Sequence, residues 1–311
     1  MSALTACWSC AISAPDPYLI STPGDRDRLE AAIAAIRETE IAGLPKNVGE
    51  AVTYTLSGGG KRLRGLLVMA SYRAAHGTGD PSGIAAAVEI IHSYSLVHDD
   101  LPCMDDDDMR RGRLSTHRAF TVPVATAAGA VMIPLAARAA HRAAVALRLP
   151  GNSCCTIVKL LMQAAGAGGM IGGQLLDLAA EGRALTRDEL DAVHGAKTGA
   201  LISVSARLGG IAAGAGKAGS EALDRYGECI GLAFQIMDDV LDVTASSDQL
   251  GKTAGRDVEL GKSTYPALLG VAGAVDRAKS LVEEGCSALR EQKMLTGELE
   301  SLAAFIVSRS H

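Results

Sequence analysis

Two aspartate clusters set in otherwise apolar sequence constrain this chain more than any other feature. They are Asp99-Asp100-Leu-Pro-Cys-Met-Asp105 and Asp238-Asp239-Val-Leu-Asp242. Asp238 and Asp242 are four residues apart, so a helix would place them on one face, one turn apart, together with Gln235. Carboxylates this close together within apolar sequence repel one another unless a divalent cation neutralises them. The second cluster therefore predicts a cation site on a helix.

The first cluster is wider, and a regular helix would not align its two ends. Asp99 and Asp105 are six residues apart, which puts them about 120° out of alignment on a helix. Pro102 lies between them, and proline removes a helix hydrogen bond, so we expect a bulge that returns Asp105 to the position of an i+4 residue. Carboxylate oxygens without cysteine or paired histidine suit Mg²⁺, which usually shares its coordination with water and a substrate's phosphates. Two such clusters facing one cavity could hold a diphosphate from both sides.

The remaining sequence is typical of helices. Hydrophobic residues make up 48% of the 311 positions and aromatic residues only 3%, and the abundant alanine and leucine favour helix over strand. Apolar residues recur at steps of three and four from Asp25 onward, and no window alternates as a strand would. We expect helices near 66–75, 83–100, 124–147, 154–180, 187–214, 218–243 and 264–290. The sequence thus predicts an all-α fold, with a loose leader over 1–25 and one all-helical domain, a single large helical bundle, over 26–311.

Charge and cysteine content limit the possible partners and compartment. The formal net charge of −5 argues against nucleic acid as the main ligand, because binding it needs a concentrated basic surface. The seven cysteines are irregularly spaced, which is typical of reduced thiols in the cytoplasm. Residues 1–20 lack the pattern of a signal peptide. The uncharged stretch Ala119–Ala137 contains Pro123 and Pro134, so we expect a buried helix rather than a membrane span.

Basic residues beside glycines or acidic clusters are the candidates for binding phosphate. They are Lys61, Arg62 and Arg64 after three glycines, Arg110 and Arg111 after the first cluster, Lys197 with Thr198, and Lys252 and Lys262 after the second cluster. Guanidinium groups bind phosphate oxygens in pairs, and lysine supplies a point charge. Gly58-Gly59-Gly60-Lys61 is not a P-loop, because the required spacing and a preceding strand are both lacking. Each residue alone could be a surface charge, but their shared placement favours a diphosphate site.

Taken together, these motifs resemble the trans-isoprenyl diphosphate synthases (the polyprenyl synthetase family), of the bacterial farnesyl diphosphate synthase type. The matching stretches are Gly-Gly-Lys61-Arg-Leu-Arg64, Glu89-Ile-Ile-His92 through the first aspartate cluster to Arg110-Arg111-Gly, Gly169-Met-Ile-Gly-Gly-Gln174-Leu-Leu-Asp177-Leu, His194-Gly-Ala-Lys197-Thr198-Gly, Phe234-Gln235 with the second cluster, Gly251-Lys252, and Gly261-Lys262-Ser-Thr-Tyr265-Pro. They follow the family's order over residues 58–266. Gly65, Thr121-Val122 and Ala130 depart from the family's pattern without removing a metal ligand or phosphate contact.

The resemblance implies an all-α fold around a central cavity, usually in a homodimer, and three Mg²⁺ ions. It implies an enzyme that condenses isopentenyl diphosphate with dimethylallyl or geranyl diphosphate. The implied metal ligands are Asp99, Asp100, Asp105, Asp238 and Asp242. Lys61, Arg64, His92 and Arg111 would bind isopentenyl diphosphate, and Arg110, Lys197, Thr198, Gln235, Lys252 and Lys262 would bind the allylic substrate. The catalytic residues would be Asp99, Asp105, Asp238, Lys197 and Arg110.

The length of the product is expected to depend on Tyr94 and its neighbour Ser95. Tyr94 lies five residues before Asp99, about 7–8 Å along a helix. In the family it resembles, an aromatic side chain at this depth forms a floor that stops growth at C15. The sequence therefore favours farnesyl diphosphate as product, with geranylgeranyl diphosphate as the alternative.

Three other classes of protein remain as alternatives. Glu89-Ile-Ile-His92 matches the Glu-x-x-His pattern of carboxylate-bridged di-iron bundles, but such a fold needs two of these motifs and two further glutamates. A terpene cyclase also ionises a prenyl diphosphate but needs no site for isopentenyl diphosphate, so Lys61, Arg64 and His92 argue against it. A non-catalytic partner subunit is expected to lose aspartates, and both clusters are intact.

Overall fold

The computed structural model describes residues 22–244 and 262–308, so Lys252 and most of the predicted leader lie outside the described residues. The helices are α1 (Asp25–Glu40), α2 (Lys46–Leu56), α3 (Leu63–Ala74), α4 (Ser82–Asp99), α5 (Thr116–Ala119), α6 (Val122–Ala146), α7 (Gly151–Ala165), α8 (Met170–Ala179), α9 (Arg187–His194), π-helix η2 (Gly195–Gly199), α10 (Ala200–Ala213), α11 (Lys217–Thr244), α14 (Tyr265–Glu291) and α15 (Gly297–Ser308). The prediction of an all-α fold is confirmed.

The described residues also form one short hairpin, which the sequence pattern did not reveal. Strands β1 (Met109–Arg110) and β2 (Arg113–Leu114) pair in antiparallel register, with Arg110 opposite Arg113. Each strand is two residues long, too short for the alternation by which strands are recognised. The hairpin directly follows the first aspartate cluster and carries Arg110 and Arg111.

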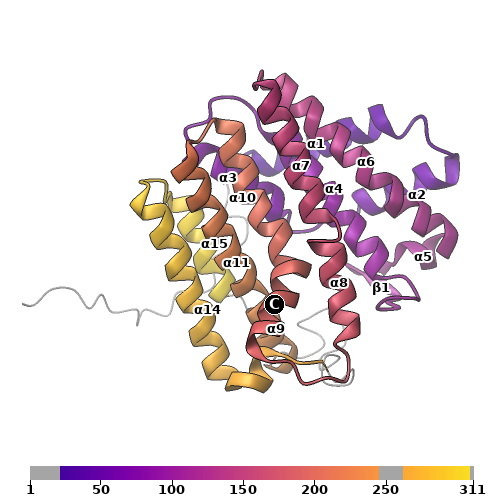
Figure 1. Ribbon diagram of the computed structural model, residues 1–311. Helices are drawn as coiled ribbons and strands as arrows, with labels where there is room; N and C mark the ends of the chain where they lie inside the picture. The colour runs from indigo at the N-terminus through magenta and orange to yellow at the C-terminus, as the bar shows by residue number, and fades with distance from the viewer. Residues whose placement is uncertain (1–21, 245–261, 309–311) are drawn as a thin grey trace, which may run out of the picture.

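The helices pack as a bundle whose middle is formed by α3 and α10. Figure 1 shows α14 and α15 on one flank and α2 and α6 on the other, with α3, α4 and α10 between them. Val68 and Met69 of α3 belong to one apolar cluster, with residues of α4, α6 and α7. Leu67 and Ala70 on the other side of α3 belong to a second cluster, with residues of α11, α14 and α15. Burial of both faces of α3 therefore joins the two halves of the core.

Threonine side chains cap several helices of the bundle. The hydroxyl of Thr121 accepts a hydrogen bond from the backbone amide of Val124 at the start of α6. Thr186 and Glu189 form a reciprocal capping box at α9, and Thr264 caps α14. These contacts satisfy amides that have no partner in the first turn of a helix, and they fix where each helix begins.

Two long helices expected from the sequence are interrupted in the structure. The stretch 154–180 is not one helix, because α7 ends at Ala165 and α8 begins at Met170. A Cβ atom at Gly169 or Gly172 would lie 2.2 or 1.9 Å from a carbonyl oxygen of the preceding turn, so this tight break requires glycine. The stretch 187–214 is interrupted by the π-helix η2, which inserts an extra residue into the helical turn.

Two segments have the length and hydropathy of membrane-crossing helices. They are Val122–Ala146, with mean hydropathy 1.5, and Gly151–Ala179, with mean hydropathy 1.4. Within the bundle α6 packs against α4 and α7, and α7 packs against α10. In the most apolar window of each segment, 39% and 33% of the residues are buried. Val122–Ala146 is α6 and Gly151–Ala179 spans α7 and α8, so both segments belong to the bundle, and their exposed apolar side chains include Val122, Leu175 and Leu176.

Candidate active site

The first aspartate cluster lies where α4 ends. The helix stops at Asp99 instead of continuing through a bulge, and Pro102 lies in the turn that follows. The backbone amide of Asp105 donates a 2.8 Å hydrogen bond to the carbonyl oxygen of Asp99. The prediction of a bulge within a continuous helix is therefore wrong, because the helix ends at Asp99. The turn that follows nevertheless brings the backbone of Asp105 back to Asp99.

The environment of Asp99 makes its charged form costly. Burial raises the pKa of this carboxyl to about 7, and Asp105 and Asp100 add to the shift, whereas Lys197 and Arg110 oppose it. Because burial and the neighbouring acids disfavour the ionised carboxylate, a cation close to it would stabilise that charged form. Asp99, Asp105 and Lys197 thus share one electrostatic environment, although Lys197 comes from a distant part of the chain.

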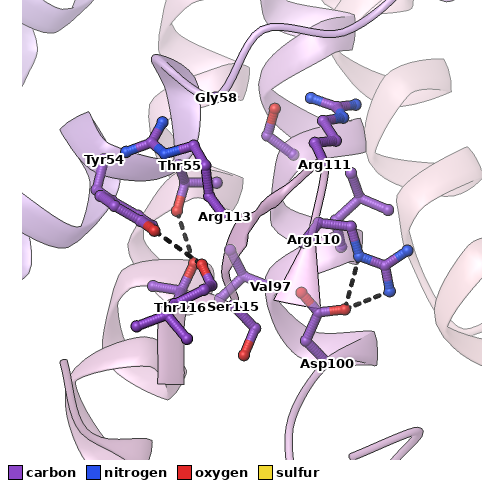
Figure 2. Close-up of a pocket in the computed structure, with 13 residues that line it drawn as sticks. Tyr54, Thr55, Gly58, Val97, Asp100, Arg110, Arg111, Arg113, Ser115 and Thr116 are labelled. Atoms are coloured by element: carbon purple, nitrogen blue, oxygen red, sulfur yellow. Dashed lines mark hydrogen bonds and ion pairs between the residues drawn. The ribbon is translucent and has the colours of Figure 1, made fainter. Parts of the chain in front are cut away.

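Asp100 has a different role from its neighbour. Its side chain is only 3% exposed, and its Oδ1 accepts a 2.9 Å hydrogen bond from Nε of Arg110 and a second bond from the same guanidinium. Arg110 also pairs with Asp107 at 3.0 Å. Figure 2 shows the carboxylate of Asp100 facing the end of the Arg110 side chain. The structure therefore joins these two predicted site residues to each other.

The hairpin that carries Arg110 and Arg111 is fixed against α2 through its second strand. The hydroxyl of Tyr54 donates a 2.8 Å hydrogen bond to the carbonyl oxygen of Leu114, and the Arg113 guanidinium lies 4.0 Å from the centre of the Tyr54 ring. The hydroxyls of Thr55 on α2 and Thr116 on α5 share a 3.0 Å hydrogen bond. These residues line the pocket behind the hairpin in Figure 2. The backbone that positions the two arginines is thereby held in place.

The second cluster lies on α11 and divides into two faces. Asp239 is buried and has three partners: Nε2 of His194 at 3.2 Å, the amide of Tyr265 at 3.0 Å and Nε2 of Gln235 at 3.2 Å. Asp242 is only 4% exposed, and neither of its carboxylate oxygens has a hydrogen-bond partner among the described residues. Asp238 is half-buried on the same face as Asp242.

The donor atoms of these clusters fit a hard divalent cation. Asp99, Asp105, Asp238 and Asp242 offer carboxylate oxygens alone, as Mg²⁺ prefers. A buried carboxylate without hydrogen bonds is costly to maintain, and a bound cation would remove that cost at Asp242. The residues therefore fit the metal that the sequence predicted.

A group of cations lies between α3, α4 and the hairpin. Nη1 of Arg64 is 3.4 Å from Nε2 of His92. Burial lowers the pKa of Arg64, Glu89 and Asp238 oppose the shift, and Arg111 adds to it. The charges of α3, the hairpin and α11 therefore act on one another. Burial and the nearby arginines, Arg64 first, hold the pKa of His92 well below 6.5, so its imidazole is neutral.

Glycines before α3 make room for these cations. Arg111 donates a hydrogen bond to the carbonyl oxygen of Gly59. Gly60 has φ +127°, and a Cβ atom there would lie 2.7 Å from the Arg111 guanidinium carbon, so only glycine fits both the backbone and the arginine. Lys61 places its ammonium 5.7 Å from the ring centre of Phe305 on α15.

The π-helix η2 connects the two aspartate clusters. Thr198 donates a 2.8 Å hydrogen bond to Gln235 on α11. Lys197 lies 2.6 Å and Lys262 3.1 Å from Oδ2 of Asp177 on α8. Burial alone would raise the pKa of Asp177, but these two lysines lower it instead. Single π-turns often mark functional sites, and this one brings Lys197 and Thr198 between the clusters.

Sequence reasoning assigned no role to three residues that the structure places in this site. Asp177 joins Lys197 to Lys262. Glu89, only 1% exposed, accepts a 2.8 Å hydrogen bond from the amide of Gly65 and faces Arg62. Gln174 is buried, and its amide has no hydrogen-bond partner among the described residues. All three are polar residues inside motifs that match the family, and that placement was the signal in the sequence that could have identified them.

These contacts bear on the di-iron alternative and on one departure from the family pattern. Glu89 and His92 each face an arginine, which accounts for the Glu-x-x-His spacing without iron. Gly65 replaces a proline that would lack the amide donated to Glu89. The departure at Gly65 therefore adds a contact beneath the cations.

The predicted chain-length residues lie on α4 below Asp99. Tyr94 is 2% exposed, and its ring packs edge-on against His98, with centroids 4.9 Å apart. His98 in turn lies over Gly129 of α6, where a Cβ atom would be 2.2 Å from its Nε2. Ser95 is buried and its hydroxyl donates to the carbonyl oxygen of His92. The Tyr94 ring is therefore fixed between α4 and α6.

An all-α bundle with two aspartate clusters and surrounding cations defines the class of protein. A family model described as polyprenyl synthetase matches residues 45–296. The chain belongs to the polyprenyl synthetase family.

Known proteins similar to this chain support that assignment. It is 44% identical over 268 residues to a farnesyl diphosphate synthase of Escherichia coli K12, covering 85% of this chain and 89% of that protein. It is 39% identical to chloroplastic geranylgeranyl pyrophosphate synthase 9 of Arabidopsis thaliana, covering 85% and 75%.

Solved structures agree with the fold. An apo FPP/GFPP synthase of Zymomonas mobilis matches with TM-score 0.76 and 31% identity, covering 91% of this chain and 99% of that one. A Helicobacter pylori geranyltransferase, complexed with magnesium and isoprenyl diphosphate, matches with TM-score 0.77 and 28% identity, covering 94% and 96%. The fold is thus that of isoprenyl diphosphate synthases.

Proposed function

We propose that this protein is a Mg²⁺-dependent prenyltransferase that joins isopentenyl diphosphate to an allylic diphosphate. The observation that carries the proposal is the buried carboxylate of Asp242, which has no hydrogen-bond partner in the part of the chain that the structure describes and lies on the same helix as Asp238, whose charge acts on Arg64. A buried carboxylate without a hydrogen bond, close to cationic side chains, suits a ligand that brings both a metal and phosphate. The similarity to farnesyl diphosphate synthases supports the same function.

The aspartates divide the work of holding metal. The Mg²⁺ ions, three in number when diphosphate is bound, would be held by Asp99, Asp105, Asp238 and Asp242. Asp100 would hold Arg110. When bound, Mg²⁺ neutralises the diphosphate and so favours its departure. The Helicobacter geranyltransferase complexed with magnesium supports this choice of metal.

The basic residues would bind the two substrates on opposite sides of the reacting carbons. Arg110, Lys197, Thr198, Gln235 and Lys262, together with Lys252, would hold the allylic diphosphate. The allylic C–O bond then breaks, and its electron pair leaves with the diphosphate. Arg64, Arg111, His92 and Lys61 would hold isopentenyl diphosphate so that its double bond attacks the allylic carbon. A proton is lost from the new product to the departing diphosphate, which balances the reaction.

Farnesyl diphosphate is the proposed product. His98 holds the ring of Tyr94 in place, and this ring would form the floor that stops the growing prenyl tail. Several relatives at 36–44% identity are farnesyl diphosphate synthases, which supports C15. Geranylgeranyl diphosphate is the second candidate, because geranylgeranyl synthases are also similar.

We also propose that the enzyme is a cytoplasmic homodimer. The exposed apolar side chains of α6 and α8, among them Val122, Leu175 and Leu176, would be covered by a second copy.

A product assay tests the function. The full-length protein is incubated with labelled isopentenyl diphosphate and either dimethylallyl or geranyl diphosphate, with and without Mg²⁺, and the products are separated by chromatography. We expect farnesyl diphosphate from either starter and no product without a divalent metal. Consumption of geranyl diphosphate without isopentenyl diphosphate, with release of a cyclic hydrocarbon, would instead identify a cyclase.

A further inference from the structure

A second group of side chains that could bind a metal ion directly follows the first aspartate cluster in the chain. Asp106, Asp108 and His117 each offer one ligand atom, and these atoms all lie within 4.8 Å of one another. The two aspartates come from the loop after Asp105, and His117 comes from α5. None of the three belongs to the site proposed for Mg²⁺ and diphosphate.

The imidazole of His117 lacks a hydrogen bond on the side that faces the two carboxylates. His117 is only 5% exposed, and its Nε2 has no hydrogen-bond partner among the described residues. This nitrogen lies 4.0 Å from Oδ1 of Asp106, which is too far for a hydrogen bond. On the other side of the ring, Nδ1 is 3.1 Å from Oγ of the buried Ser115. The ring is therefore held from behind, with a buried nitrogen directed at two carboxylates.

We propose that Asp106, Asp108 and His117 form a separate binding site for a divalent transition-metal ion such as Mn²⁺, Co²⁺ or Zn²⁺. A hydrogen bond from the second ring nitrogen commonly orients a metal-binding histidine, and here Ser115 is the partner of Nδ1. One imidazole nitrogen and two carboxylates suit first-row transition ions, whereas Mg²⁺ prefers oxygen ligands alone. The class of ligand thus distinguishes this site from the two aspartate clusters.

The geometry needs only a small adjustment to hold an ion. Ligand atoms about 2.0–2.2 Å from one ion lie at most about 4.4 Å apart, and the three candidate ligand atoms all lie within 4.8 Å of one another. Asp106 and Asp108 are exposed, so their side chains can move toward the fixed imidazole. Arg118 now pairs with Asp108 and competes with the metal. The bound ion would tie the loop that follows Asp105 to α5.

Titration of the full-length, metal-stripped protein with Co²⁺ alone, without diphosphate, tests the proposal through the visible absorption of the bound ion. We expect one Co²⁺ per chain with the spectrum of nitrogen and oxygen ligands and no sulfur charge-transfer band. His117→Ala should weaken binding at least about 10-fold, and Arg118→Ala should strengthen it. His141→Ala, which removes an exposed histidine of α6, and Asp238→Asn should leave this binding unchanged.

Two results would overturn the inference: wild-type and His117→Ala proteins that bind Co²⁺ alike, or binding that disappears in Asp238→Asn and persists in His117→Ala. Circular dichroism of each variant checks folding, and His117→Gln replaces His117→Ala if that variant unfolds. The measurement does not depend on turnover, so its failure is distinguishable from failure of the proposed function, which the product assay tests.

Discussion

Asp100 and Arg110 are joined by two hydrogen bonds from one guanidinium to one carboxylate oxygen, although they lie on different elements. The carboxylate of Asp100, the second aspartate of the first cluster, is therefore paired with Arg110. The pairing holds the arginine at the edge of the proposed diphosphate site, and Asp99 and Asp105 remain the metal ligands that we propose for this cluster.

This pair predicts a strong coupling between two substitutions. Asp100→Asn and Arg110→Gln should each lower kcat/KM for the allylic substrate, and the double variant should lose little more than either single one. The expected coupling energy is about 1.5–3 kcal/mol, typical of hydrogen bonds between charged groups. Steady-state kinetics of the four proteins measure it, and additive losses would show that Asp100 acts independently of Arg110.

Asp242 should show a conflict between stability and activity. Its buried carboxylate has no hydrogen-bond partner among the described residues, so Asp242→Asn should raise the free energy of unfolding of the metal-free protein by about 1–3 kcal/mol. The same change should reduce turnover by roughly 100-fold or more, because it weakens a proposed ligand of the Mg²⁺ ions. Urea unfolding without metal, together with a product assay, measures both effects. Glu228→Gln, on the exposed side of α11, should change neither, and a less stable Asp242→Asn protein would contradict the account.

Tyr94 should control product length. Because its ring is buried against His98, Tyr94→Ala would open space below the site and shift products from C15 toward C20 and longer. Ser93→Ala, at a buried neighbour on another face of α4, should leave the product unchanged. Chromatography of dephosphorylated products reports the distribution, and an unaltered chain length in Tyr94→Ala would rule out this floor.

His92 should make stability depend on pH. Burial and the adjacent arginines hold its folded-state pKa well below the ordinary value of 6.5, so below that pH the unfolded chain binds a proton that the folded protein does not. Stability from this group is therefore complete above about pH 6.5 and falls as the pH drops, by up to about 1 kcal/mol per pH unit. Thermal melts between pH 8 and pH 5.5 should show a weaker decline in His92→Gln than in wild type. Equal declines in both proteins would exclude His92 as the source, and His141→Gln is the matched control.

The sequence predicted those parts of the site that depend on helical periodicity. Asp238 and Asp242 share a face because they are four residues apart on α11. The pairing of Asp100 with Arg110 was not predictable from spacing, since it requires the hairpin to fold back after the aspartate loop. The interruption at η2 was not predictable either, because α10, which follows it, is buried on nearly every face and so carries little periodic pattern that an inserted residue could disturb. Contacts that depend on tertiary folding, such as Lys197 with Asp177, were therefore missed.

The central claim is that the two aspartate clusters hold one metal-bound diphosphate between them. Calorimetric titration with inorganic pyrophosphate, with and without Mg²⁺, tests it most directly in wild type, Asp99→Asn and Asp238→Asn. We expect wild type to bind pyrophosphate tightly only when Mg²⁺ is present, and each variant to bind it at least about 10-fold more weakly. Equal binding without Mg²⁺, or wild-type affinity in Asp238→Asn, would contradict it.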